Sequence, residues 1–173
     1  SPRRFGKTSL VVKALRESNR KHIMLNLQSV VSTEDFAARL LKEIFKIYKF
    51  EKVKHFIKNF RIVPTISLNP MTDGVDVSIM PMVDNRVLIE DVFALLQAIA
   101  SEEDRLIVVL DEFQEIKSID KNLDRLLRSI MQLHKNINYL FLGSQESMMR
   151  EIFEKKKSPF FHFGQLLHLD KIP

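Results

Sequence analysis

The chain has 173 residues, of which 45% are hydrophobic and 28% are charged, and it contains no cysteine. A chain of this length forms one domain with a substantial core, and its composition argues against disorder. The lack of cysteine excludes disulfides, thiolate metal sites and a cysteine nucleophile. No apolar run approaches the roughly 20 residues of a membrane-spanning helix, and no secretory signal pattern opens the sequence. We therefore expect a cytoplasmic protein with no membrane partner.

The formal net charge of +5 is concentrated in one segment. Seven basic residues lie between Lys42 and Arg61, where the only acids are Glu43 and Glu51. The ordinary interpretation is a solvated helical face. The alternative is a surface that meets nucleic acid or an acidic partner, although no aromatic stacking pattern or base-reading motif accompanies it.

Apolar periodicity alternates between helix and strand along the chain, which predicts an α/β fold with a mainly parallel sheet. The predicted strands span 22–27, 106–110, 139–142 and, last, 166–169. The predicted helices span 8–16, 88–100, 123–133 and 147–153, and a further helix begins behind an N-cap at Ser32. Asp35 completes a capping box with that serine.

Two alternating segments, 61–68 and 75–80, flank a turn-rich connection at 69–74. This pattern predicts a β-hairpin, inserted between helices and spanning about 61–81. Pro64 and Pro81 suit an edge position, because proline cannot donate to a sheet ladder.

The opening SPRRFGKTS matches the phosphate-loop pattern G-x-x-x-x-G-K-[ST], except that Ser1 replaces the first glycine. A tight loop at a helix N-terminus supplies convergent backbone N–H donors to phosphate oxygens. Gly6 allows close approach, Lys7 contacts the β- and γ-phosphates, and the Thr8 hydroxyl holds Mg²⁺. The alternative is a basic turn entering a helix, with solvated arginines. On the first interpretation ATP is bound by Pro2, Arg3, Arg4, Phe5, Gly6, Lys7, Thr8 and Ser9.

The apolar segment LIVVL at 106–110 leads directly into Asp111 and Glu112. Ligands of open α/β sheets gather at the carboxyl ends of strands. We expect Asp111 to bind Mg²⁺ beside Thr8, and Glu112 to polarise the water that attacks the γ-phosphate. The alternative is a strand followed by an ordinary acidic loop.

The strand YLFL at 139–142 has a polar end of its own, Gly143-Ser144-Gln145. Ser144 or Gln145 would sense the γ-phosphate or orient the attacking water. The equally supported alternative is a strand-to-helix turn in which Ser144 caps the next helix.

With these motifs in place, the chain resembles the AAA+-like STAND ATPases, in particular the archaeal and bacterial group of ATP-binding proteins. The resemblance covers nearly the whole chain, and its most specific parts are LDEFQEI and YLFLGS. It implies a P-loop NTPase three-layer sandwich acting as a molecular switch, in which ATP hydrolysis drives assembly or signalling. The partners that it implies are attached effector domains or further copies in a homo-oligomer. Gly6, Lys7 and Thr8 take Walker A roles, Asp111 and Glu112 Walker B roles, and Ser144 the sensor position.

The sequence departs from that pattern at both ends. No strand precedes the loop and no helical lid follows, so we expect 1–173 to be a single but incomplete domain, a fragment or truncated product. The missing strand is expected in the middle of the sheet, between the strand that ends at Gly143 and the strand near Leu166. Gln165 stands where many relatives have arginine, which leaves Arg128 as a substitute.

Two other functions stay open at this stage. One is a non-catalytic nucleotide-binding or scaffold module with a degraded loop. The other is a nucleic-acid-binding regulator that uses the basic segment between Lys42 and Arg61.

Overall fold

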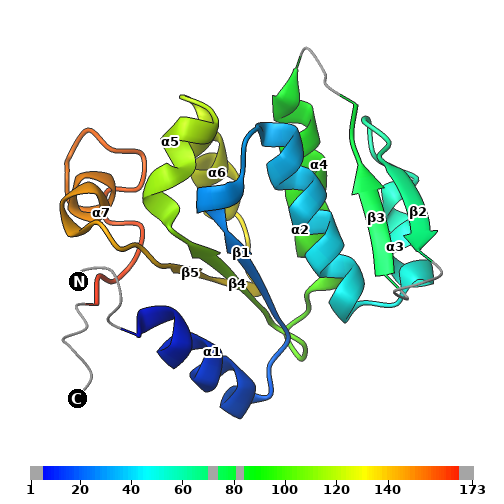
Figure 1. Cartoon of the computed structure of the whole chain (residues 1–173), viewed down its shortest axis with the longest axis horizontal. Helices are drawn as coiled ribbons and strands as arrows, with labels where there is room; N and C mark the ends of the chain where they lie inside the picture. Colours follow the sequence, from blue (N-terminus) through cyan, green and yellow to red (C-terminus); the bar gives the residue numbers. More distant parts are fainter. Residues whose placement is uncertain (1–5, 70–73, 81–83, 168–173) are drawn as a thin grey trace.

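The computed structural model describes residues 6–69, 74–80 and 84–167. Within these ranges a three-stranded sheet is formed by β1 (His22–Asn26), β4 (Leu106–Asp111) and β5 (Ile137–Phe141). Its strand order is β1-β4-β5 and both pairings are parallel (Figure 1). The predicted α/β class with a parallel sheet is confirmed.

The register of the sheet brings the carboxyl ends of its strands together. Asn26 at the end of β1 is paired with Asp111 at the end of β4. Leu110 is in turn paired with Phe141 at the end of β5. The residues that follow β4 and β5 therefore share one edge of the sheet.

Helices cover both faces of this sheet, which explains why the β4 segment is continuously apolar. Val109 packs with Leu15 of α1 (Lys7–Ser18) on one face. Val108 and Leu110 belong to the main core on the other face, which is covered by α2 (Thr33–Ile47) and α4 (Asn85–Ile99). Figure 1 shows α1 on the opposite side of the sheet from these two helices. The result is a three-layer arrangement.

The start of α2 follows from its capping sequence. The backbone N–H of Asp35 donates to Ser32 Oγ over 3.2 Å, and Asp35 Oδ2 accepts from the N–H of Val31 over 3.1 Å. The predicted N-cap at Ser32 is therefore confirmed, whereas Asp35 accepts from the N–H of Val31 and not from that of Ser32 as a capping box requires. Behind it, Phe36, Leu40, Leu41 and Ile44 form a fully buried stripe.

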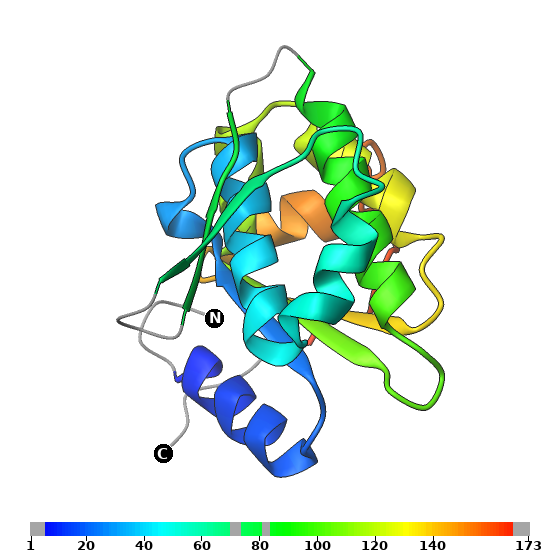
Figure 2. The ribbon, with the colours of Figure 1, turned by 90° about the vertical axis from the view of Figure 1, so that its right-hand side faces the viewer.

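The predicted hairpin is present as the antiparallel pair β2 (Thr65–Asn69) and β3 (Gly74–Ser78), shorter than the segments that predicted it. Figure 1 and Figure 2 show the hairpin on the side of α2 that faces away from the three-stranded sheet. Val77 is buried in the main core, and Lys42 of α2 donates to Asp76 of β3 over 3.1 Å. Pro64 directly precedes β2, and Pro81 lies outside the described residues.

The remaining elements connect these layers. They are the 3-10 turns η1 (Leu27–Ser29) and η2 (Phe113–Glu115) and the helices α3 (Phe50–Ile57), α5 (Ile116–Ile119), α6 (Leu123–Met131) and α7 (Glu146–Phe153). Leu166 and Leu167 are outside any strand, and the rest of the predicted last strand is not among the described residues. In the part of the chain that the structure describes, every helix is too short or too polar to cross a membrane.

Candidate functional site

The described part of the predicted phosphate loop is Gly6 together with the first turn of α1. Gly6 caps the helix in the left-handed region, at φ 72° and ψ 11°, where a residue without Cβ is unstrained. Its carbonyl accepts from the N–H of Leu10 over 2.8 Å, so the helix is established from Lys7 onward. The predicted loop residues Pro2, Arg3, Arg4 and Phe5 lie outside the described residues.

The two predicted metal ligands are in contact. Thr8 Oγ1 donates a hydrogen bond to Asp111 Oδ2 over 3.0 Å. Asp111 is only 6% exposed, and its other oxygen accepts from the backbone N–H of Glu112 over 2.9 Å. Folding therefore brings the first turn of α1 against the end of β4.

Glu112 stands at the same edge in an unusual backbone conformation. Its φ of 53° and ψ of 45° lie in the left-handed region, which is costly for a non-glycine residue and concentrates at functional sites. Ser144 Oγ donates to Glu112 Oε2 over 2.7 Å. The capping alternative for Ser144 is wrong, because the N-cap of α7 is Gln145 and no side chain caps that helix.

Gln114 also belongs to this cluster, although it was not predicted from the sequence. Its Nε2 donates to Glu112 Oε2, the oxygen that also accepts from Ser144. Gln114 is 3% exposed. The signal available in the sequence was a glutamine two residues after the Asp111-Glu112 pair.

Other predicted residues do not join the cluster. Ser9 is exposed on α1. Arg128 stacks over the Phe163 ring, 4.3 Å from its centroid, and donates to Gln132 Oε1 over 2.6 Å.

A cavity of about 490 Å³ extends along β5 and reaches Lys7. Its walls include Val11 of α1, Gly143 two residues after β5, Met149 of α7 and Gln165. This volume lies within the range of small-molecule pockets, roughly 300–1,000 Å³. The hollow therefore begins beside the predicted phosphate-binding lysine.

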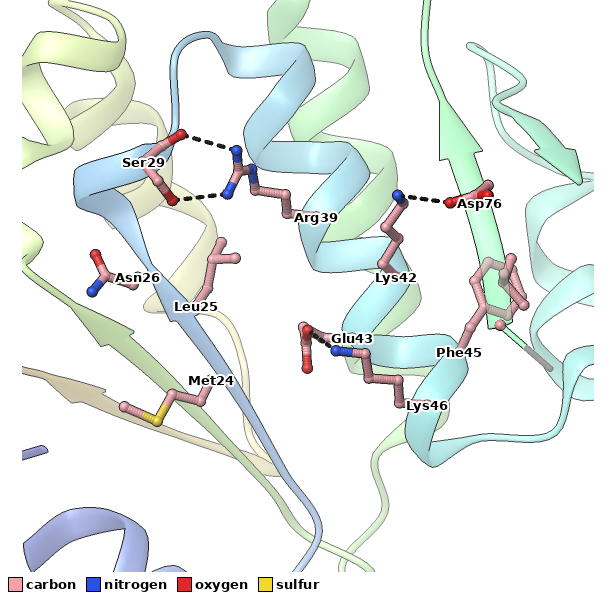
Figure 3. A pocket seen from close by; sticks show the side chains of 12 residues that line it. Met24, Leu25, Asn26, Ser29, Arg39, Lys42, Glu43, Phe45, Lys46 and Asp76 are labelled. Atoms are coloured by element: carbon pink, nitrogen blue, oxygen red, sulfur yellow. Dashed lines mark hydrogen bonds and ion pairs between the residues drawn. The ribbon is translucent and has the colours of Figure 1, made fainter. Parts of the chain in front are cut away.

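The basic segment is partly neutralised by local ion pairs. A second cavity, of about 440 Å³, lies between β1, α2 and β3. Among its lining residues, Lys42 forms an ion pair with Asp76 and Lys46 forms one with Glu43 (Figure 3). At the far end of the segment, Arg61 binds Glu90 and Asp91. Three of the seven cations that suggested a nucleic-acid surface therefore have carboxylate partners.

The donor set of the site fits magnesium. Within the described ranges there is no cluster of three or more His, Asp or Glu residues that could hold a metal by itself. Mg²⁺ does not need one, because it is commonly bound through one or two protein oxygens together with substrate phosphates and water. The Thr8 hydroxyl and the Asp111 carboxylate are hard oxygen ligands of that kind.

Comparisons with known proteins bear on the fold. No protein-family profile and no curated protein sequence matches the chain. Among solved structures, a Walker-type ATPase of Pyrococcus abyssi is similar, with 21% sequence identity and a TM-score of 0.58. The alignment covers 94% of this chain and 44% of that protein, so this chain spans less than half of its length. At this identity the similarity shows the fold alone, an α/β architecture shared with that ATPase.

Proposed function

We propose that the chain binds ATP with Mg²⁺ at the start of α1 and hydrolyses it to ADP and phosphate. The observation that carries this proposal is the hydrogen bond between Thr8 and Asp111, because it brings the two proposed metal ligands together. The solved Walker-type ATPase supports it through its fold.

Four side chains, those of Lys7, Thr8, Asp111 and Glu112, have a part in the proposed reaction. Backbone N–H groups at the start of α1, together with Lys7, bind the phosphates, and the helix dipole favours their negative charge. Thr8 and Asp111 would hold Mg²⁺, which would neutralise negative charge on the phosphates when bound. Glu112 orients the attacking water and accepts its proton as the oxygen–phosphorus bond to the leaving ADP breaks.

The finer proposal is a nucleotide-dependent switch of STAND or AAA+ type, with effector domains or further copies as partners. It rests on the resemblance of LDEFQEI and YLFLGS to that group. The test of this switch is to measure the oligomeric state by light scattering, once with ATP and once with ADP. An identical mass in both nucleotides, at concentrations that saturate the site, would count against a switch that works by assembly.

The test of nucleotide binding compares two lysines of α1. Lys7→Ala removes the proposed phosphate contact, whereas Lys13→Ala removes an exposed lysine that lies 3.9 Å from Glu17. A hydrogen bond to a charged group contributes about 1.5–3 kcal/mol, which corresponds to roughly a tenfold to hundredfold loss of affinity. We expect that loss for Lys7→Ala and an unchanged dissociation constant for Lys13→Ala, measured with a fluorescent ATP analogue. Equal affinities in both variants would refute the site.

A further inference from the structure

We propose that Gln114 is a positioning residue, which together with Ser144 fixes the carboxylate of Glu112 for hydrolysis. This inference rests on the proposed ATPase function. Gln114 itself is too deeply buried, at 3% exposure, to be placed on the substrate. Its action is exerted through Glu112.

The first support is the geometry of the contact. Gln114 Nε2 and Ser144 Oγ both donate to Glu112 Oε2. They approach from different elements, Gln114 from η2 after β4 and Ser144 from the connection between β5 and α7. Two donors on one oxygen restrict the rotation of the carboxylate more than either does alone.

The second support is an unfavourable feature that a purely structural residue would not retain. Gln114 Oε1 is buried and has no hydrogen-bond partner among the described residues. An unsatisfied buried polar atom costs about 1–3 kcal/mol, and an apolar side chain of similar volume would remove that penalty. Departures from local stability rules concentrate at functional sites, where another requirement outweighs them.

The third support is the space left for the amide. A Cβ placed on Gly143 would lie 2.7 Å from Gln114 Oε1, closer than real contacts allow, and would also clash with Met149. The absence of a Cβ at residue 143, just after β5, therefore leaves room for the amide and for Met149 in these positions.

The experiment uses Gln114→Met, which keeps the approximate volume and removes the donor. We expect kcat for ATP hydrolysis to fall about 10- to 100-fold, because a misplaced catalytic group loses that much through orientation. The dissociation constant for ATP should stay within about threefold, since Gln114 is not proposed to contact nucleotide. The matched control is Gln97→Met, which removes a half-buried glutamine of α4 that accepts from the N–H of Lys135.

A double variant at Gln114 and Ser144 distinguishes a positioning role from a general loss of stability. Because both donors act on one oxygen, Gln114→Met combined with Ser144→Ala should lower kcat by less than the product of the two single effects. A Gln114→Met enzyme with unaltered kcat, or one whose kcat and affinity fall together, overturns the positioning role while leaving the ATPase proposal intact. A wild-type chain with neither ATP binding nor turnover overturns both.

Discussion

Thr8 and Asp111 are 103 positions apart in sequence, yet the Thr8 hydroxyl donates to Asp111 Oδ2 over 3.0 Å. This contact exists because α1 packs on one face of the sheet while β4 ends at the edge where α1 begins. On the proposed function, the Thr8 hydroxyl and the Asp111 carboxylate would be the protein ligands of Mg²⁺. The contact therefore marks where the metal would bind.

The metal site predicts a specific effect of Thr8→Val, which keeps the shape of the side chain and removes the hydroxyl. We expect the Mg²⁺ concentration for half-maximal turnover to rise about tenfold, because a hard oxygen ligand is lost. Thr8→Ser retains a hydroxyl and should restore the wild-type value. Titration of Mg²⁺ at saturating ATP measures all three proteins, and coincident curves would exclude Thr8 as a ligand.

Glu112→Gln tests the proposed base without altering side-chain volume. The amide cannot accept the proton of the attacking water, so we expect turnover to fall about 100-fold or more while ATP affinity changes little. Phosphate release and equilibrium binding provide the two measurements. Glu115→Gln neutralises a half-buried acid three residues away and serves as the control. Equal turnover in the wild type and Glu112→Gln would assign the base to another group.

Gly143→Ala places a methyl group against Gln114 and Met149. We expect a loss of about 1–3 kcal/mol in unfolding free energy, the usual effect of overpacking a filled site, together with a lower kcat. Gly164→Ala is the matched control, because a Cβ there has no neighbour within 4 Å among the described atoms. Urea unfolding compares the two variants, and similar stabilities would show that the end of β5 relaxes easily.

The burial of His134 leads us to expect that the free energy of unfolding depends on pH, independently of turnover. Burial lowers the pKa of His134 below its usual value of 6.5, and Nδ1 lies 2.6 Å from the hydroxyl of Tyr139. The unfolded chain therefore takes up this proton at higher pH than the folded chain does. Stability from this group is complete above about pH 6.5 and decreases as the pH falls toward the folded-state pKa.

Urea midpoints at pH 7.5 and 5.5 measure this dependence. His134→Gln should show a smaller decrease between the two pH values than the wild type, whereas His55→Gln, on the exposed face of α3, should behave like the wild type. An equal decrease in His134→Gln and wild type would attribute the pH dependence to other groups.

Local patterns in the sequence were sufficient for much of the fold. The buried segment at 106–110 formed a strand, Ser32 capped the helix predicted behind it, and the two alternating segments paired as a hairpin. These features depend on neighbours within a few residues, so periodicity and capping rules describe them. The type of residue at Gly6, Thr8 and Asp111 likewise indicated phosphate and metal chemistry before any contact was known.

Only the tertiary structure decided which side chains meet. Whether Ser144 caps a helix or binds Glu112 depends on the parallel register of β4 and β5, which no local pattern specifies. The role of Gln114 depends on the backbone of Glu112 and on the space beside Gly143. The residue types at the site were thus readable from the chain, whereas their mutual contacts arise from packing between segments distant in sequence.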